Sequence, residues 1–292
     1  MKKVLITGAQ GFLGKNFSES WKRKFSLFLP SIEELDVLDE KAVEAYLKKH
    51  NFDAVVHCAA VGVSRKDNTS NAALLNLKMF SNLARCSEYY NRMIFIGSGA
   101  EYDKRRDLIK VKEEEFGKSV PADPYGFSKY LCTLLIKKIP NIVNLRAFAV
   151  FGKYEDYETR FISNTICKSL LGLPVVINQD VRFDYFSVSD LARVAEHFVT
   201  HEFKRQFYNV GLGQGITLTE IVKKIEAISG KKMEVKIKKP GMNKEYTCDN
   251  SRLLSEIPNF VFTPFDEALA SLYNWYTNNM EKIEKTKLFF DA

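Results

Sequence analysis

The fold is decided by the stretch Lys3-Val4-Leu5-Ile6-Thr7-Gly8-Ala9-Gln10-Gly11-Phe12-Leu13-Gly14. Its first five residues are mostly apolar and β-branched, which predicts a buried strand, and an amphipathic segment follows the last glycine. Glycines spaced in this way between a strand and a helix are typical of a dinucleotide-binding turn. Gly8 would bend the chain, Gly11 would let backbone amides approach a pyrophosphate, and Gly14 would allow the helix to pack on the strand. The positive end of the helix dipole would then face the anion.

Composition indicates a soluble, globular protein. The chain has 292 residues, of which 46% are hydrophobic and 27% charged, as in ordinary globular domains. Its apolar runs are far shorter than the ~20 residues of a membrane span. Val4-Leu5-Ile6 is also too short for the apolar region of a signal peptide. We expect a cytoplasmic protein of about two domains without membrane association.

Charge and cysteine usage exclude further classes. The net charge is +7, but the lysines are spread over helix faces and are not interleaved with aromatic residues. We therefore expect no nucleic-acid partner, and the charge can attract small anionic ligands. The cysteines are odd in number and form no CxxC pair, which predicts neither a disulfide framework nor a metal site. They are Cys58, Cys86, Cys132, Cys167 and Cys248.

Short apolar runs and longer amphipathic runs alternate through the first half of the chain. This pattern predicts a Rossmann-type, doubly wound parallel sheet with helices on both faces. Asp123-Pro124 predicts a helix N-cap followed by proline at the first helical position. The expected strands are Lys3–Thr7, Phe25–Leu29, Ala54–Cys58, Met93–Gly97 and Ile142–Arg146, and the expected helices are Leu13–Lys24, Lys41–His50, Ala72–Tyr89 and Tyr125–Ile139.

The helix and strand pattern in the second half of the chain predicts a smaller α/β lobe. We expect this lobe to bind substrate at the carboxyl ends of the main sheet. We assign residues 1–152 to the dinucleotide-binding domain and 153–292 mainly to the lobe, with a segment around 180–212 returning to the first domain. Expected helices are Thr159–Leu171, a helix from Asp190, Thr217–Ser229 and Pro264–Tyr276; expected strands are Val175–Ile177, Asp184–Val188, Gln206–Val210 and Met233–Ile237.

Tyr125 and Lys129 are spaced i and i+4, which places a phenol and an ammonium on one helix face. An ammonium beside a phenol favours the phenolate, and such a phenol can exchange a proton with a sugar alcohol during hydride transfer. Ser98 follows an expected strand, at the carboxyl edge of the sheet, where its hydroxyl can bond a substrate oxygen.

These features together resemble the extended short-chain dehydrogenases/reductases that act on nucleotide sugars. The resemblance covers the glycine turn, His57-Cys58-Ala59-Ala60, Ser98, Tyr125-x-x-x-Lys129, and several later segments. It implies a catalytic triad of Ser98, Tyr125 and Lys129, a nucleotide-diphosphate sugar as substrate, and a homodimer. Implied cofactor contacts are Gly8, Gly11, Phe12, Leu13 and Gly14 at the pyrophosphate, Asp36 and Val37 near adenine, and Ala59, Ala60, Tyr125, Lys129 and Phe148 along the rest of the cofactor.

Departures from the family pattern narrow the expected activity. Relatives that dehydrate sugars carry Asp-Glu directly after the serine, whereas this chain has Gly99-Ala100. Glu101 follows, and in a strand its side chain would point to the opposite face. The Cys and His with which the fucose-synthase type of reductase epimerises are also replaced, at Ala100 and near Arg160. The resemblance therefore implies hydride transfer alone.

The end of the second expected strand bears on cofactor choice. Relatives that prefer NAD usually carry an acidic residue there, but this chain has Pro30-Ser31. Ser31 could donate to a 2′-phosphate, so we expect NADPH to be accepted at least as well as NADH. The alternative partners for the adenosine ribose are Asp36, Glu33 and Glu34.

The expected substrate contacts are Ser98, Arg160, Asn164 and Arg182. Arg182 stands one place before the position, here Phe183, at which relatives carry an arginine that binds the diphosphate. A planar guanidinium suits a diphosphate. The alternative for Arg160, Asn164 and Arg182 is that they are surface residues.

Three functions follow as hypotheses. The first is reduction of a nucleotide-linked 4-keto-6-deoxy sugar at C4 by NAD(P)H. The second is 4-epimerisation with tightly bound NAD. The third is a non-catalytic nucleotide-binding relative, which the presence of both Tyr125 and Lys129 disfavours.

Overall fold

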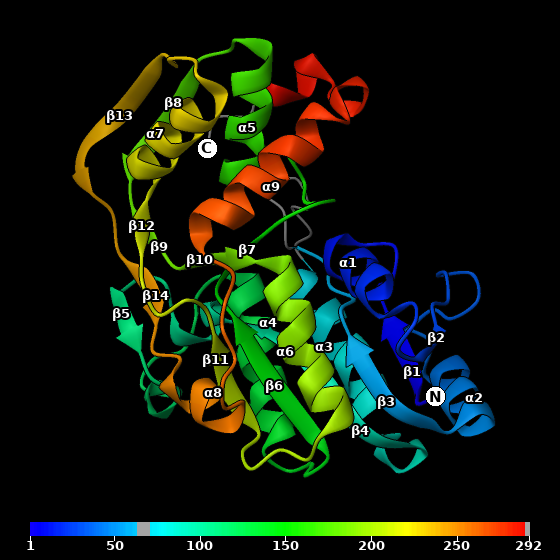
Figure 1. The fold of residues 1–292 in the computed structure, drawn as a ribbon. Helices are drawn as coiled ribbons and strands as arrows, with labels where there is room; N and C mark the ends of the chain where they lie inside the picture. Colours follow the sequence, from blue (N-terminus) through cyan, green and yellow to red (C-terminus); the bar gives the residue numbers. More distant parts are fainter. Residues whose placement is uncertain (63–70, 290–292) are drawn as a thin grey trace.

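A parallel sheet of six strands forms the centre of the computed structural model (Figure 1), which describes residues 1–62 and 71–289. The strand order is β11-β6-β4-β3-β1-β2, and every neighbouring pair is parallel. This topology confirms the predicted Rossmann-type α/β fold. The strands are β1 (Lys3–Thr7), β2 (Ser26–Phe28), β3 (Phe52–His57), β4 (Tyr90–Ser98), β6 (Ile142–Ala147) and β11 (Phe207–Val210).

Helices cover both faces of this sheet because successive residues of each strand point to opposite sides. On β1, Val4 and Ile6 pack with α1 (Phe12–Trp21) and α6 (Val188–Thr200). Leu5, between them, packs on the other face. The helices that bury residues with Leu5 are α2 (Glu40–His50), α3 (Ala72–Ala84) and α4 (Pro124–Ile136).

Local signals place the start of α4 as predicted. The side chain of Asp123 accepts a hydrogen bond from Gly126 N at 2.9 Å, and Pro124 is the first helical residue. Several other elements were predicted too long. β2 has three residues, α1 ends at Trp21 and α4 ends at Ile136. α3 ends at Ala84, after which Ser87–Tyr89 form the 3₁₀ helix η1.

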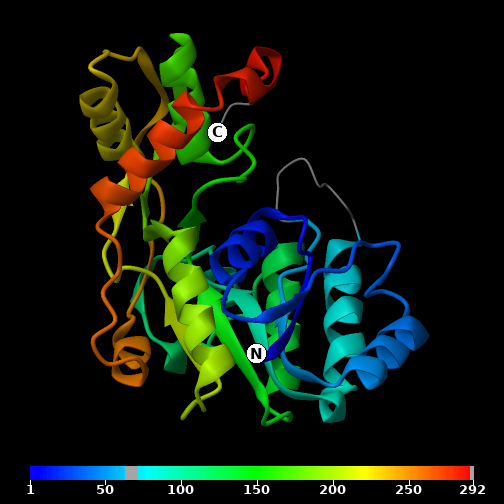
Figure 2. The same ribbon diagram turned by 45° about the vertical axis from the view of Figure 1, so that its right-hand side comes forward.

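A second lobe has its own hydrophobic core (Figures 1 and 2). Its helices α5 (Phe161–Leu171), α7 (Leu218–Ser229) and α9 (Phe265–Thr277) bury apolar residues together with β8 (Val175–Asp180). β8 pairs in parallel with β13 (Val235–Met242), a longer strand than the expected Met233–Ile237. The 3₁₀ helices η4 (Met280–Lys282) and η5 (Lys285–Phe289) end the described chain.

Two small sheets connect the halves of the molecule. The first has the order β12-β9-β14-β5, from β12 (Ile216–Thr217), β9 (Arg182–Phe183), β14 (Tyr246–Cys248) and β5 (Leu108–Val111). The second pairs β10 (Tyr185–Ser187) with β7 (Ala149–Phe151). The expected strand Asp184–Val188 is thus shorter, because Val188 already begins α6. The remaining elements are η2 (Gly99–Tyr102), η3 (Glu113–Glu115) and α8 (Ser251–Glu256).

Within the described ranges, no helix is long and apolar enough to cross a membrane. The same residues contain no group of three or more His, Cys, Asp and Glu side chains placed to hold a metal ion.

Candidate active site

The turn after β1 requires glycine at two of its three glycine positions. Gly8 has φ +67°, and a Cβ on it would lie 2.7 Å from the backbone N of Ala59. A Cβ on Gly14 would lie 2.3 Å from the carbonyl oxygen of Gly8. These close contacts bring the end of β1, the end of β3 and the start of α1 together.

The same turn fits the pyrophosphate of a dinucleotide. Gly11 is the N-cap of α1, has extended backbone, and has no side-chain cap. Phe12 and Leu13 are the first helical residues, so the N–H groups of the first turn remain available to an anion. The turn is built from backbone, and a side chain on Gly8 or Gly14 would force that backbone apart.

The segment expected near adenosine follows β2. Asp36 accepts a hydrogen bond from Leu38 N at 2.9 Å, and the Val37 carbonyl accepts one from the Asn82 side chain at 3.0 Å. Ser31 N donates to the Glu34 carboxylate at 2.8 Å. A hydrogen bond from the Ser31 side chain lowers the pKa of Glu33. Ser31 therefore lies between two carboxylates, a surrounding that sequence spacing did not reveal.

Lys129 is buried against strand β4. It is 4% exposed, and its Nζ donates to the carbonyl of Ile96 in β4 at 2.8 Å. The Nζ also lies 4.4 Å from the ring centroid of Phe95 and 5.8 Å from that of Tyr125. The expected i, i+4 arrangement thus places the ammonium against the phenol ring.

Ser98 ends β4 and caps η2. Its Oγ accepts a hydrogen bond from Ala100 N at 3.1 Å. The start of α4 packs directly on η2, since a Cβ on Gly126 would lie 2.6 Å from the Ala100 carbonyl oxygen. Gly126 follows Tyr125, so this close approach brings the helix that carries Tyr125 and Lys129 to the strand end that carries Ser98.

The buried Glu101 carboxylate holds the end of β4 through hydrogen bonds. Residues 99–102 form a 3₁₀ helix and not the strand that we assumed when placing this side chain. Glu101 is fully buried and accepts hydrogen bonds from Ser98 N at 3.1 Å and from the Thr133 hydroxyl at 2.7 Å. Its carboxylate also pairs with the Arg146 Nε at 2.7 Å. These partners occupy Glu101, which is therefore structural.

His57 is likewise a packed residue. It is 2% exposed, and its Nδ1 lies 2.7 Å from the hydroxyl of Thr7. Burial, together with the charge of Lys129, lowers its pKa to about 3. The imidazole is neutral at physiological pH, as expected for a core histidine.

The three lobe residues predicted to bind substrate are engaged locally. Arg160 precedes α5, and its Nε lies 3.8 Å from the Glu155 carboxylate. The Asn164 side chain donates to the carbonyls of Tyr157 and Glu158 at 3.0 and 3.2 Å, which fixes its own loop. Arg182 donates to the Gly215 carbonyl at 2.8 Å.

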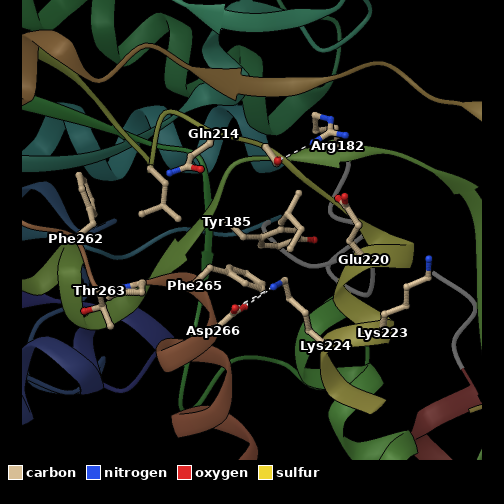
Figure 3. Close-up of a pocket in the computed structure, with 14 residues that line it drawn as sticks. Arg182, Tyr185, Gln214, Glu220, Lys223, Lys224, Phe262, Thr263, Phe265 and Asp266 are labelled. Carbon is tan, nitrogen blue, oxygen red and sulfur yellow. Dashed lines mark hydrogen bonds and ion pairs between the residues drawn. The ribbon is translucent and has the colours of Figure 1, made fainter. Parts of the chain in front are cut away.

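Arg182 also lines a pocket of about 790 Å³ (Figure 3). Neighbouring side chains there include Lys224, which pairs with Asp266 at 2.7 Å. Of the described residues that line this pocket, none belongs to the Ser98, Tyr125 and Lys129 triad. Arg182 thus lines this pocket without those three residues, and its contact with substrate remains a prediction.

Tyr246 of β14 is a site residue that the sequence did not indicate. A Cβ on Gly99 would lie 2.5 Å from the Tyr246 hydroxyl and 2.8 Å from Cζ of Phe148. The rings of Phe148 and Tyr246 pack with centroids 4.7 Å apart. Phe148, expected beside the cofactor, thus lies with Tyr246 against the residue that follows Ser98. No motif or periodicity links Tyr246 to that residue.

Two curated relatives align over most of the chain. GDP-L-colitose synthase of Yersinia pseudotuberculosis is 29% identical over 282 residues, covering 87% of this chain and 91% of its own length. UDP-glucose 4-epimerase of Caenorhabditis elegans is 25% identical over 342 residues, covering 94% and 98%. The fold is also that of Thermotoga maritima UDP-glucose 4-epimerase, solved with UDP-glucose, with a TM-score of 0.83, 20% identity and coverage of 95% and 99%.

The family assignment rests on a match over most of the chain. Residues 4–211 match the NAD dependent epimerase/dehydratase family. This range contains the glycine turn, Ser98, Tyr125 and Lys129. The chain belongs to the NAD dependent epimerase/dehydratase family.

Proposed function

We propose that this protein reduces the C4 ketone of a nucleotide-diphosphate-linked 4-keto-6-deoxy sugar, with NAD(P)H as hydride donor. The observation that supports the proposal is the close approach of α4, which carries Tyr125 and Lys129, to the end of β4, which carries Ser98. The glycine turn at the start of α1 provides a pyrophosphate site at the same edge of the sheet.

The triad residues take distinct roles in this reaction. A bound nicotinamide supplies the hydride. Tyr125 donates its phenolic proton to the oxygen at C4, and the Ser98 hydroxyl holds that oxygen in place. Lys129 stabilises the phenolate that Tyr125 leaves behind, and its buried Nζ is fixed by the Ile96 carbonyl.

Simple hydride transfer is favoured over dehydration or epimerisation beside the ketone. Those reactions need an additional acid and base next to the sugar. Gly99 and Ala100 occupy the positions directly after Ser98, and Glu101 is bound by Arg146 and Thr133. No proton carrier follows Ser98 at these three positions.

A 4-epimerase is the second candidate, supported by the relatives of that name. It would use the same triad to oxidise and re-reduce C4, so side-chain chemistry alone does not separate the two. An epimerase retains its NAD and turns over without added NAD(P)H. A non-catalytic relative is disfavoured by the ordered triad.

The cofactor preference is part of the proposal. Ser31 can donate to a 2′-phosphate, which supports use of NADPH, whereas the Glu33 and Glu34 carboxylates beside it favour NADH. We propose that both are accepted.

The experiment is a screen of the purified chain with GDP- and UDP-linked 4-keto-6-deoxyhexoses, each with NADPH and NADH. Oxidation of the added cofactor at 340 nm with formation of a C4 alcohol is the expected result. Conversion of UDP-glucose to UDP-galactose without added cofactor would contradict the reductase assignment and support the 4-epimerase.

A further inference from the structure

One face of α1 contacts the segment that leads the chain from β7 into the lobe. We call residues 152–160, between the end of β7 and the start of α5, the connecting segment. Phe12, Asn16 and Glu19 share this face of α1, because they are four and three residues apart along the helix. Trp21 is buried in the core on another face. In Figures 1 and 2, α1 lies on the side of the six-stranded sheet toward the lobe. The helix thus packs on the sheet with one face and holds the connecting segment with another.

The first contacts with the connecting segment are made by Phe12 and Asn16. A Cβ on Gly152 would lie 3.8 Å from Cε2 of Phe12, so the start of the segment lies against this ring. Asn16 is 5% exposed, and its Nδ2 donates to the carbonyls of Lys153 and Phe12, each at 2.8 Å. This buried amide fixes the connecting segment to α1 where the segment leaves β7.

The next contact reaches from α1 into the lobe through Tyr154. The Glu19 carboxylate accepts hydrogen bonds from the Tyr154 hydroxyl at 2.5 Å and from Lys153 Nζ at 2.8 Å. The Tyr154 ring meets the Trp275 ring of α9 edge to face, with centroids 5.4 Å apart and planes at 80°. Trp275 in turn packs against the hydrophobic core of the lobe. Tyr154 therefore joins α1 to the lobe, with its hydroxyl on Glu19 and its ring on Trp275.

The backbone of Tyr154 is a second observation that singles out this residue. Its φ is +68°, in the left-handed region that bulky side chains rarely adopt. Glycine would take up this conformation without a steric penalty. The chain carries tyrosine there instead, and the contacts of the hydroxyl and the ring give that side chain a function that offsets the strain.

We propose that Glu19 and Tyr154 are positioning residues that hold the lobe in register with α1, so that a sugar bound by the lobe meets the nicotinamide at the triad. This inference rests on the proposed function, in which the dinucleotide binds at the start of α1 and the lobe binds the nucleotide sugar. Gly11, the N-cap of α1, lies about two turns before Glu19 on the same helix. A shift of the lobe against α1 therefore moves the sugar relative to the cofactor, which slows hydride transfer, and leaves the glycine turn unchanged.

The first test needs no substrate and uses the emission of Trp275. The chain has two tryptophans, Trp21 and Trp275, so Trp21→Phe leaves Trp275 as the only one. In that background Glu19→Ala should release Tyr154 from the Trp275 ring. Emission should then move to longer wavelength, and quenching by acrylamide should increase. Unchanged emission and quenching in Glu19→Ala would overturn the proposal.

Two additions keep this test decisive. If Trp21→Phe does not fold, acrylamide quenching is measured in the protein with both tryptophans, because Trp21 is fully buried and Trp275 only partly. Glu196→Ala is the matched control, since it removes another exposed ion pair of 2.7 Å, with Lys24. This variant should leave the Trp275 signal unchanged. The same change in Glu196→Ala as in Glu19→Ala would contradict a specific contact with the lobe.

The second test measures kinetics with the GDP-linked 4-keto-6-deoxyhexose and NADPH. Tyr154→Phe keeps the ring and removes the hydroxyl, and kcat/KM for the sugar should fall by about 3- to 10-fold, as for loss of one hydrogen bond. The Kd for NADPH should stay near the wild-type value. In a Glu19→Ala background the same substitution should have little further effect, because its partner is gone. Wild-type kcat/KM in Tyr154→Phe, or additive losses in the double variant, would overturn the proposal.

The two tests also separate this inference from the proposed function. A wild-type protein that reduces none of the 4-keto sugars would overturn the proposed function. A response of Trp275 to Glu19→Ala would still support the link between α1 and the lobe in that case. Ketoreduction by the wild type without any response of Trp275 or of kcat/KM would support the proposed function and overturn the positioning role of Glu19 and Tyr154.

Discussion

Nε of Arg146 lies 2.7 Å from a carboxylate oxygen of Glu101, and both side chains are buried below the strand end that carries Ser98. The Glu101 carboxylate also accepts the Ser98 N–H at 3.1 Å. The ion pair therefore fixes the backbone at Ser98 from within the core.

Glu101→Gln should destabilise the fold because it leaves the Arg146 charge buried without its partner. Removing one member of such a pair typically costs about 3–5 kcal/mol. Urea unfolding of wild type and variant measures the difference. The control is Glu196→Gln, which breaks the more exposed pair with Lys24 at 2.7 Å and should change stability by less than about 1 kcal/mol. Equal losses of unfolding free energy in the two variants would contradict a larger contribution from the buried pair.

The glycine turn predicts different effects at two of its positions. Gly14→Ala places a Cβ 2.3 Å from the Gly8 carbonyl oxygen, so it should lower stability by about 1–3 kcal/mol. Gly11→Ala has its nearest such contact at 3.3 Å and should fold normally but bind NAD(P)H more weakly. Thermal melts and cofactor titrations check both variants. A stable Gly14→Ala protein with full cofactor affinity would contradict this geometry.

Cofactor choice can be shifted in both directions around Ser31. Ser31→Asp should weaken NADPH selectively, by about 10- to 100-fold, through repulsion of the 2′-phosphate. Glu34→Gln should favour NADPH, because it removes one of the carboxylates beside Ser31. Kd values for NADPH and NADH are the measurement, with Glu44→Gln on α2 as a surface control. If Ser31→Asp weakens both cofactors equally, Ser31 does not lie at the 2′ position.

The buried Glu155 carboxyl should make the stability of the fold decrease as pH rises. Burial raises its pKa from 4.5 to about 7, although Arg160 and Ser163 lower it in part. The folded state therefore binds a proton more tightly than the unfolded state, and this contribution to stability falls as pH rises from about 4.5 to 7. Glu155→Gln should remove that slope and be more stable than wild type at pH 8, by about 1–3 kcal/mol. Burial also raises the pKa of Asp184, to about 6, which adds a pH dependence of stability with the same sign. This contribution is present in both proteins, so it cancels in the difference between variant and wild type. A variant that is less stable at pH 8 would contradict the assignment.

Local patterns predicted the sheet and the turn well. The run Lys3–Thr7 became β1 with those bounds, and Asp123-Pro124 became the start of α4. Both depend on propensities and caps that act over a few residues. The pairing of Tyr125 with Lys129 follows from them, because both residues lie on one helix.

Contacts between distant segments could not be predicted in this way. β14 pairs with β5 from Leu108 to Tyr246, a separation that no period or motif encodes. The same applies to Ser31, whose carboxylate neighbours depend on how the chain folds back after β2. The environment of Arg182 depends on the pairing of β9 with β12, which brings Gly215 within hydrogen-bonding distance.

The most direct test of the central claim is the kinetics of Tyr125→Phe with the GDP-linked 4-keto-6-deoxyhexose and NADPH. The substitution removes only the proposed proton donor, so kcat should fall by about 10²- to 10⁴-fold while the Kd for NADPH stays near the wild-type value. Tyr130→Phe, on the same helix, is the control and should keep full activity. A folded Tyr125→Phe protein with near wild-type kcat would contradict the proposed mechanism.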